Sequence, residues 1–168
     1  LGAALTILLA HNFITFPLNH IKIAIPFFIF TIFAQAFVMF YFIGVSKLSE
    51  NVLRIITSKN DLEELFENPP KDLSPYKKKV EKFVYDASTC KRQTIPWTML
   101  MLILGMGAFL LGGAHDTGLV SKYIHSGLVY GFSASLIIGF FRQWHYLGKS
   151  HLLLRKLKAL FSISDSSM

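Results

Sequence analysis

Long uncharged stretches dominate the pattern of residues along this chain. Residues 23–46 carry no charged side chain and contain seven phenylalanines. Because a helix needs about 20 apolar residues to cross a bilayer, this stretch predicts a transmembrane helix. Residues 95–114 and 123–141 predict two further spans in the same way. Residues 1–18 are mostly apolar and predict a first span, with a re-entrant or interfacial segment as the alternative interpretation.

The region between the second and third predicted spans has a different character. Residues 47–92 contain ten Lys/Arg and eight Asp/Glu. The pair Asn60 and Glu63 predicts a capping box that opens a short helix, and Ser74 followed by Pro75 predicts the start of another. Apolar residues at helical spacing give both flanks an amphipathic pattern, namely Leu48, Val52, Ile55 and Ile56 before the break and Val80, Phe83, Val84 and Ala87 after it.

Local signals also predict where the later spans begin and end. Thr94 is a predicted N-cap and Pro96 a first-turn proline, so we expect a new helix to begin there. Gly112 and Gly113 predict its end. After Arg142, leucines and cations alternate in a pattern that predicts a helix lying along the membrane surface, followed by a disordered tail.

These elements predict an all-α integral membrane protein. We expect a bundle of four transmembrane helices, or three if residues 1–18 do not span, with an amphipathic helical segment between the second and third spans. The predicted regions are a first hairpin (1–46), the amphipathic segment (47–93), a second hairpin (94–141), and an interfacial helix with its tail (142–168).

Composition and charge agree with this fold and orient it. The chain is 52% hydrophobic, only 16% charged, and carries a formal net charge of +7. Fifteen of its seventeen Lys/Arg lie in residues 47–92 or after Phe141. The positive-inside rule places both segments on the cytoplasmic or matrix side of a bacterial or organellar inner membrane, and explains the charge without a nucleic-acid partner. The single cysteine, Cys90, excludes an internal disulfide.

Histidines are the main candidates for chemistry. His11 and His125 lie at similar predicted depths in different spans, an arrangement that suits axial ligation of a b-type haem. A second hypothesis is a copper or zinc site formed by His115 and Asp116 with His125, and with His20 nearby. The alternative for every one of these histidines is solvation or a hydrogen bond between helices.

Two further sets of residues have structural and functional interpretations. Small residues recur every four positions in the last span and predict close helix packing, at Gly127, Gly131, Ser135 and Gly139. A polar aromatic cluster follows that span and predicts either a quinone headgroup site or an anchor at the membrane interface, at Arg142, Trp144, His145 and Tyr146.

Three functions follow as hypotheses. The first is a small, non-catalytic transmembrane subunit of a larger membrane complex, most plausibly a respiratory or electron-transfer complex. The second is a b-type cytochrome with haem between His11 and His125. The third is a membrane protein that binds copper or zinc. The spans contain no charged residue, which argues against a proton path or voltage sensor within this chain.

Overall fold

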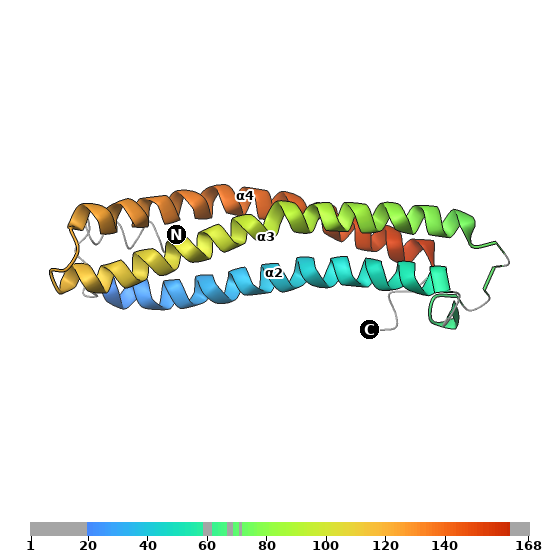
Figure 1. Cartoon of the computed structure of the whole chain (residues 1–168), viewed down its shortest axis with the longest axis horizontal. Coiled ribbons are helices and arrows are strands. Elements are labelled where there is room, and N and C mark those ends of the chain that lie inside the picture. Colours follow the sequence, from blue (N-terminus) through green and yellow to red (C-terminus); the bar gives the residue numbers. More distant parts are fainter. Residues whose placement is uncertain (1–19, 59–61, 67–68, 71, 162–168) are drawn as a thin grey trace. The chain divides into compact units, whose positions relative to one another are not determined.

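Three long helices make up most of the molecule. A computed structural model describes residues 20–58, 62–66, 69–70 and 72–161. Of these residues, 91% are helical and none is in a strand. The long helices are α2 (His20–Ser58), α3 (Ser74–Asp116) and α4 (Lys122–Leu160), and a short 3-10 helix, η1 (Leu62–Glu64), follows α2 (Figure 1). The predicted first span and the predicted disordered tail lie outside the described residues.

Each long helix is about twice as long as the hydrocarbon core of a membrane is thick. The three contain 39, 43 and 39 residues, which is roughly 58 to 65 Å at 1.5 Å per residue. The hydrocarbon core of a bilayer is about 30 Å thick. All three helices are long and apolar enough to cross a membrane, and their uncharged stretches are residues 23–46, 93–115 and 123–141. The predictions of an all-helical fold and of three long apolar helices that could span a membrane are confirmed for the described residues.

The helices pass through two compact units. Among the described residues, unit 1 comprises residues 20–38 and 96–141, and unit 2 comprises residues 39–95 and 142–161. Within each unit α3 runs antiparallel to α2 and α4 (Figure 1). The two units bury very different kinds of side chain.

Unit 1 has its apolar side chains on the outside. Phe30 and Phe37 are each 71% exposed, while the polar side chains of Thr31, Gln35 and Thr98 are buried. In water this arrangement would expose a large apolar surface, but hydrocarbon solvates the same surface at no cost. The exposed apolar surface of unit 1 is therefore compatible with an integral membrane protein. Its charged residues in the described part of the chain are Lys22, Asp116 and Lys122.

The hydroxyl groups of unit 1 bond within its helices. Thr31 Oγ1 donates to the carbonyl of Phe27 at 2.8 Å, and Ser133 Oγ donates to that of Val129 at 2.8 Å. Such bonds to the preceding turn satisfy a hydroxyl without water. Between helices, the indole Nε1 of Trp97 donates to the carbonyl of Ser135 at 3.1 Å and ties α3 to α4.

Unit 2 has the opposite, conventional arrangement, with an apolar core and a charged surface. Its main core brings together residues from all three helices and η1's flank, namely Val52, Ile56, Leu65, Val80, Leu157 and Phe161. A second cluster contains Val45, Ala87 and Leu153. The predicted stripes on both sides of the break thus face a protein core, except that Leu48 is exposed. Leu153 and Leu157, placed by the sequence on a membrane surface helix, pack against α2 and α3 instead.

The predicted break at Thr94 and Pro96 is wrong. α3 runs without interruption from Ser74 to Asp116 with Pro96 inside it. Proline removes one backbone donor from the helix, but long apolar helices tolerate it. Arg142 Nη2 of α4 donates to the carbonyl of Gln93 at 3.2 Å and to its Oε1 at 2.9 Å, in the turn that precedes Pro96.

The predicted helix end at Gly112 and Gly113 is also wrong, by three residues. α3 ends at Asp116, and Gly118 follows with a φ of 75°. The amide of Gly118 donates to the backbone carbonyl of His115, and the amide of Leu119 donates to that of Ala114. This is the Schellman pattern that closes helices at a left-handed glycine. Ser121 then caps α4, because its Oγ accepts the amide of Tyr123 at 3.3 Å.

The beginning of α3 and the linker before it were predicted in part. α3 begins at Ser74 as expected, and the amide of Ser74 donates to Asp72 Oδ1 at 2.9 Å. Backbone and side-chain hydrogen bonds from Ser74 lower the pKa of the Asp72 carboxyl. The predicted capping residue Asn60 lies outside the described residues. The short helix that it should open is a single 3-10 turn, Leu62–Glu64.

Candidate functional site

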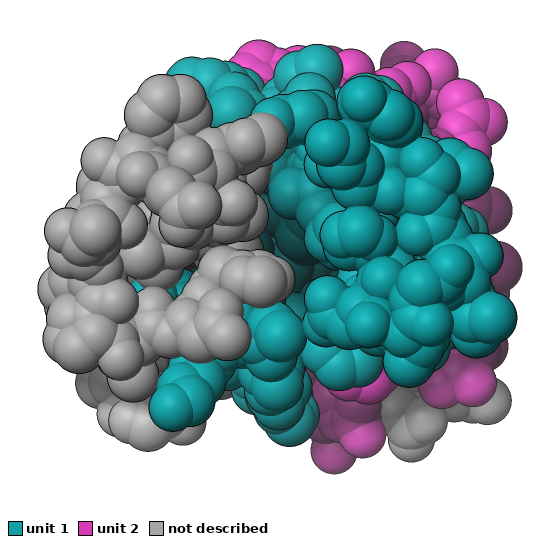
Figure 2. All heavy atoms as spheres, turned by 90° about the vertical axis from the view of Figure 1, so that its left-hand side faces the viewer, with its two compact units in different colours: residues 1–38, 96–141 teal, residues 39–95, 142–168 magenta. Residues whose placement is uncertain are grey.

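A cavity in unit 1 is the main candidate for a functional site. It has a volume of about 890 Å³ and lies among the first turns of α2, the last turns of α3 and the first turns of α4. Figure 2 looks onto this end of unit 1, which is hollowed between its helices. A cavity of this size falls within the range of small-molecule sites.

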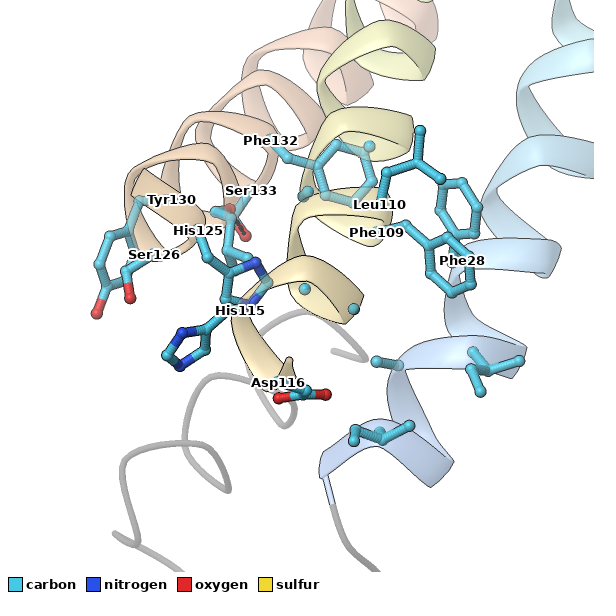
Figure 3. A pocket seen from close by; sticks show the side chains of 18 of the residues that line it. Phe28, Phe109, Leu110, His115, Asp116, His125, Ser126, Tyr130, Phe132 and Ser133 are labelled. Atoms are coloured by element: carbon cyan, nitrogen blue, oxygen red, sulfur yellow. Dashed lines mark hydrogen bonds between the residues drawn. The ribbon is translucent and has the colours of Figure 1, made fainter. Parts of the chain in front are cut away.

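Aromatic rings form the inner wall of the cavity. Phe28 of α2 and Phe109 of α3 stack with ring centroids 4.7 Å apart and planes 10° apart. Phe132 of α4 lines the same wall (Figure 3). Its ring comes so near Gly105 that a methyl group on the glycine would lie 2.9 Å from Phe132 Cε2. The wall thus offers flat apolar surfaces from all three helices.

Polar side chains gather where α3 ends and α4 begins. The rings of His115 and His125 stack with centroids 6.0 Å apart and planes 18° apart (Figure 3). The Nδ1 of His115 lies 3.2 Å from the carbonyl of Val120, so it donates there and leaves Nε2 to accept. A methyl group on Gly112 would lie 3.1 Å from Cε1 of His125, so this glycine makes room for the ring.

The predicted ligand sets are only partly represented in the described chain. His11 lies outside it, and the side chain of His20 is not among those described. The carboxylate of Asp116 points away from the two imidazoles (Figure 3). The described residues contain no group of three His, Cys, Asp or Glu side chains that could hold a metal ion. Haem ligation and a copper or zinc site both stay predictions.

The predicted stripe of small residues divides into two halves. A methyl group on Gly139 would lie 2.5 Å from Sδ of Met101 and 2.6 Å from Nε1 of Trp97. Ser135, one turn earlier, is buried and accepts the indole of the same tryptophan. Gly127 and Gly131 have no such neighbour within 4 Å. In the described chain, close contact with α3 is therefore made by the second half of the stripe.

The polar aromatic cluster after the last span lies at the beginning of the α4 part of unit 2. The Tyr146 ring contacts Arg142, with the guanidinium carbon 5.9 Å from the centroid, and packs edge-on against His145 at 5.2 Å. Trp144 is exposed. These residues line neither the cavity of unit 1 nor the smaller hollow between α3 and α4 in unit 2. A quinone site here stays a prediction.

Sequence reasoning missed two contacts that organise the bundle. These are the bond from Trp97 to the carbonyl of Ser135 and the bonds from Arg142 to Gln93. Each joins residues distant in sequence, and an interfacial Trp or Arg has a local explanation that conceals such a partner. The stacking of His115 on His125 had a usable signal, because a short turn must bring the two helix ends together.

No protein-family model, curated protein or solved structure matches the chain. A function must therefore be inferred from the residues of the cavity and of the two units.

Proposed function

We propose that this chain is an accessory, non-catalytic transmembrane subunit of a larger membrane complex. In this proposal unit 1 lies in the bilayer, and unit 2 is an arm exposed on the cytoplasmic or matrix side. The observation that carries the proposal is the length of the three helices, each of which continues well beyond its uncharged stretch. A helix does not need these extensions to span a membrane. The extensions instead provide a surface that a partner protein outside the membrane can contact.

The packing of unit 2 supports a rigid arm. Ser49, Ala87 and Ser150, one from each long helix, are at most 1% exposed. Small buried residues let helix backbones approach closely, so the extensions are packed together over their length. A stiff arm presents a fixed surface to a partner and loses little entropy on binding.

A respiratory or electron-transfer complex is the setting that we propose. The support is the cavity of unit 1, where aromatic walls meet the imidazoles of His115 and His125. Such a cavity suits a flat or amphiphilic redox molecule at a subunit boundary. The accessory role does not depend on this part of the proposal.

Native gel electrophoresis tests the accessory role. Membranes from cells that naturally contain the chain would be dissolved in digitonin, and the chain would be detected by antibody. The purified chain in the same detergent provides the size of the monomer with its micelle. We expect the chain from membranes to migrate with a much larger species. Migration of all of it with the purified monomer would contradict the proposal.

A b-type cytochrome is the second candidate, favoured by one observation. His125 is among the residues lining an apolar cavity of about 890 Å³, an environment that suits a porphyrin ring with an axial imidazole. The visible spectrum of the purified protein tests it. A Soret band lost in His125→Ala and retained in the matched variant His115→Ala would support ligation by His125. Absence of the band, or its survival in His125→Ala, would contradict it.

A further inference from the structure

Unit 2 carries exposed cations on two neighbouring helices. The last turns of α4 and the first turns of α3 lie side by side, since Pro75, Tyr76 and Lys79 line a hollow together with Ala159 and Leu160. Four exposed cations lie within about one turn of these contact residues along the two helices. We call them the basic ridge: Lys79, Lys82, Arg155 and Lys156.

The basic ridge is exposed and unneutralised. All four side chains are exposed. Within the part of the chain that the structure describes, none of the four takes part in an ion pair. These cations are therefore complementary in charge to an acidic ligand.

The hollow beside the ridge indicates what else the ligand carries. It has a volume of about 260 Å³, which gives room for a large apolar side chain, and Lys79 lies on both the hollow and the ridge. Nearby, the chain's own linker shows the same chemistry on a small scale. Phe66 packs edge-on against Tyr76 and Phe161 at 5.0 and 5.1 Å, while Glu64, two residues before it, stays exposed.

We propose that the basic ridge and its hollow bind an acidic, amphipathic segment of a partner protein. Carboxylates of the segment lie over the ridge, and one apolar side chain enters the hollow. This inference rests on the proposed function, because it identifies the surface by which the arm meets another subunit. A nucleic acid matches the charge of the ridge but supplies no aliphatic side chain for the hollow.

Binding to the full chain in nanodiscs of neutral lipid tests the inference. The probe is a short fluorescent peptide of glutamate and leucine, and the comparison probes are a glutamate–serine peptide, a single-stranded RNA and vesicles of anionic lipid. We expect the glutamate–leucine peptide to bind most tightly. Reversal of the four ridge charges should weaken it at least about tenfold, since close charge pairs at an interface contribute strongly to binding.

Two variants make the result specific. The control reverses four cations elsewhere on unit 2 and changes the net charge equally, through Lys47→Glu, Arg54→Glu, Arg92→Glu and Lys149→Glu. It should bind within about twofold of the unchanged chain, because distant exposed charges act weakly. Ala159→Phe fills the hollow without changing charge and should remove the preference for leucine over serine. Circular dichroism confirms that each variant is folded.

Several results would overturn the inference. They are no binding of the glutamate–leucine peptide, equal weakening by the ridge and control variants, or ridge-dependent binding of RNA or anionic vesicles with none of the peptide. The native gel separates this inference from the proposed function. If the ridge variant still migrates with the large species, the inference fails and the accessory role stands. If the unchanged chain migrates as a monomer, the accessory role fails by itself.

Discussion

Gly139 gives the sharpest test of how unit 1 is packed. A methyl group at this position would lie 2.5 Å from Sδ and 2.7 Å from Cε of Met101, and 2.6 Å from Nε1 of Trp97. Met101 is fully buried, and its sulfur and terminal methyl group must shift to admit the new methyl group. The indole is held by its bond to the carbonyl of Ser135. Gly139→Ala must therefore also push α4 away from α3 or break that bond.

The expected cost follows from three contributions. Overpacking costs about 1 to 3 kcal/mol. Loss of the indole hydrogen bond adds about 0.5 to 1.5 kcal/mol, while alanine in place of glycine returns about 0.5 to 1 kcal/mol through helix propensity. We expect Gly139→Ala to lower the free energy of unfolding by about 0.5 to 4 kcal/mol. Gly131→Ala is the matched control, because its new methyl group meets nothing within 4 Å, and it should be neutral or slightly stabilising.

The assay is equilibrium unfolding of the protein in mild detergent by added SDS, followed by far-UV circular dichroism. Gly139→Ala should unfold at a lower fraction of SDS than Gly131→Ala. The double variant Gly139→Ala with Met101→Ala should show a favourable coupling energy, since the shortened side chain removes the clash. Equal unfolding midpoints for the two glycine variants would refute the reasoning.

Three further predictions each concern a single residue. Trp97→Phe removes the indole donor and should cost about 1 kcal/mol in the same titration; no change would mean that the bond to Ser135 contributes nothing. Gly118→Ala puts a side chain at a φ of 75° and should cost about 1 to 2 kcal/mol, whereas a stabilised variant would rule out the left-handed turn. Burial raises the pKa of the Cys90 thiol, although the nearby Lys149 opposes the shift. Because only the thiolate reacts, Cys90 should react with a maleimide at pH 7 far more slowly than a cysteine placed at the exposed Tyr85, and equal rates would contradict its burial.

The helices themselves were predictable because membrane spans are long and leave a strong apolar signal. Ser74 was also predictable as a start, since a cap followed by a proline is a local feature. The continuity of α3 through Pro96 was not predictable in this way. The local pattern of Thr94 and Pro96 is the same whether a helix begins there or continues. The bond from Arg142 to Gln93, 49 positions away along the chain, leaves no local signal either.

The candidate site was predictable in its residue types more than in its geometry. His115 and His125 were singled out for their chemistry, and the turn that ends α3 at Gly118 brings their rings together. The sequence could not show that the aromatic wall of the cavity comes from three helices, because each phenylalanine looks like ordinary filler within its own span. Likewise, the basic ridge arises from two segments that only the fold of unit 2 makes neighbours.

Electron paramagnetic resonance of spin labels tests most directly whether unit 1 is solvated by lipid and unit 2 by water. In a Cys90→Ala background, labels would replace Phe33, Ile103 or Ile137 of unit 1, which are 61%, 64% and 62% exposed, or Tyr85 of unit 2, which is 70% exposed. Although these positions are about equally open, we predict that the first three collide with oxygen and are shielded from a water-soluble nickel chelate. The label at position 85 should show the reverse. Nickel access at all four positions in a reconstituted bilayer would contradict the account.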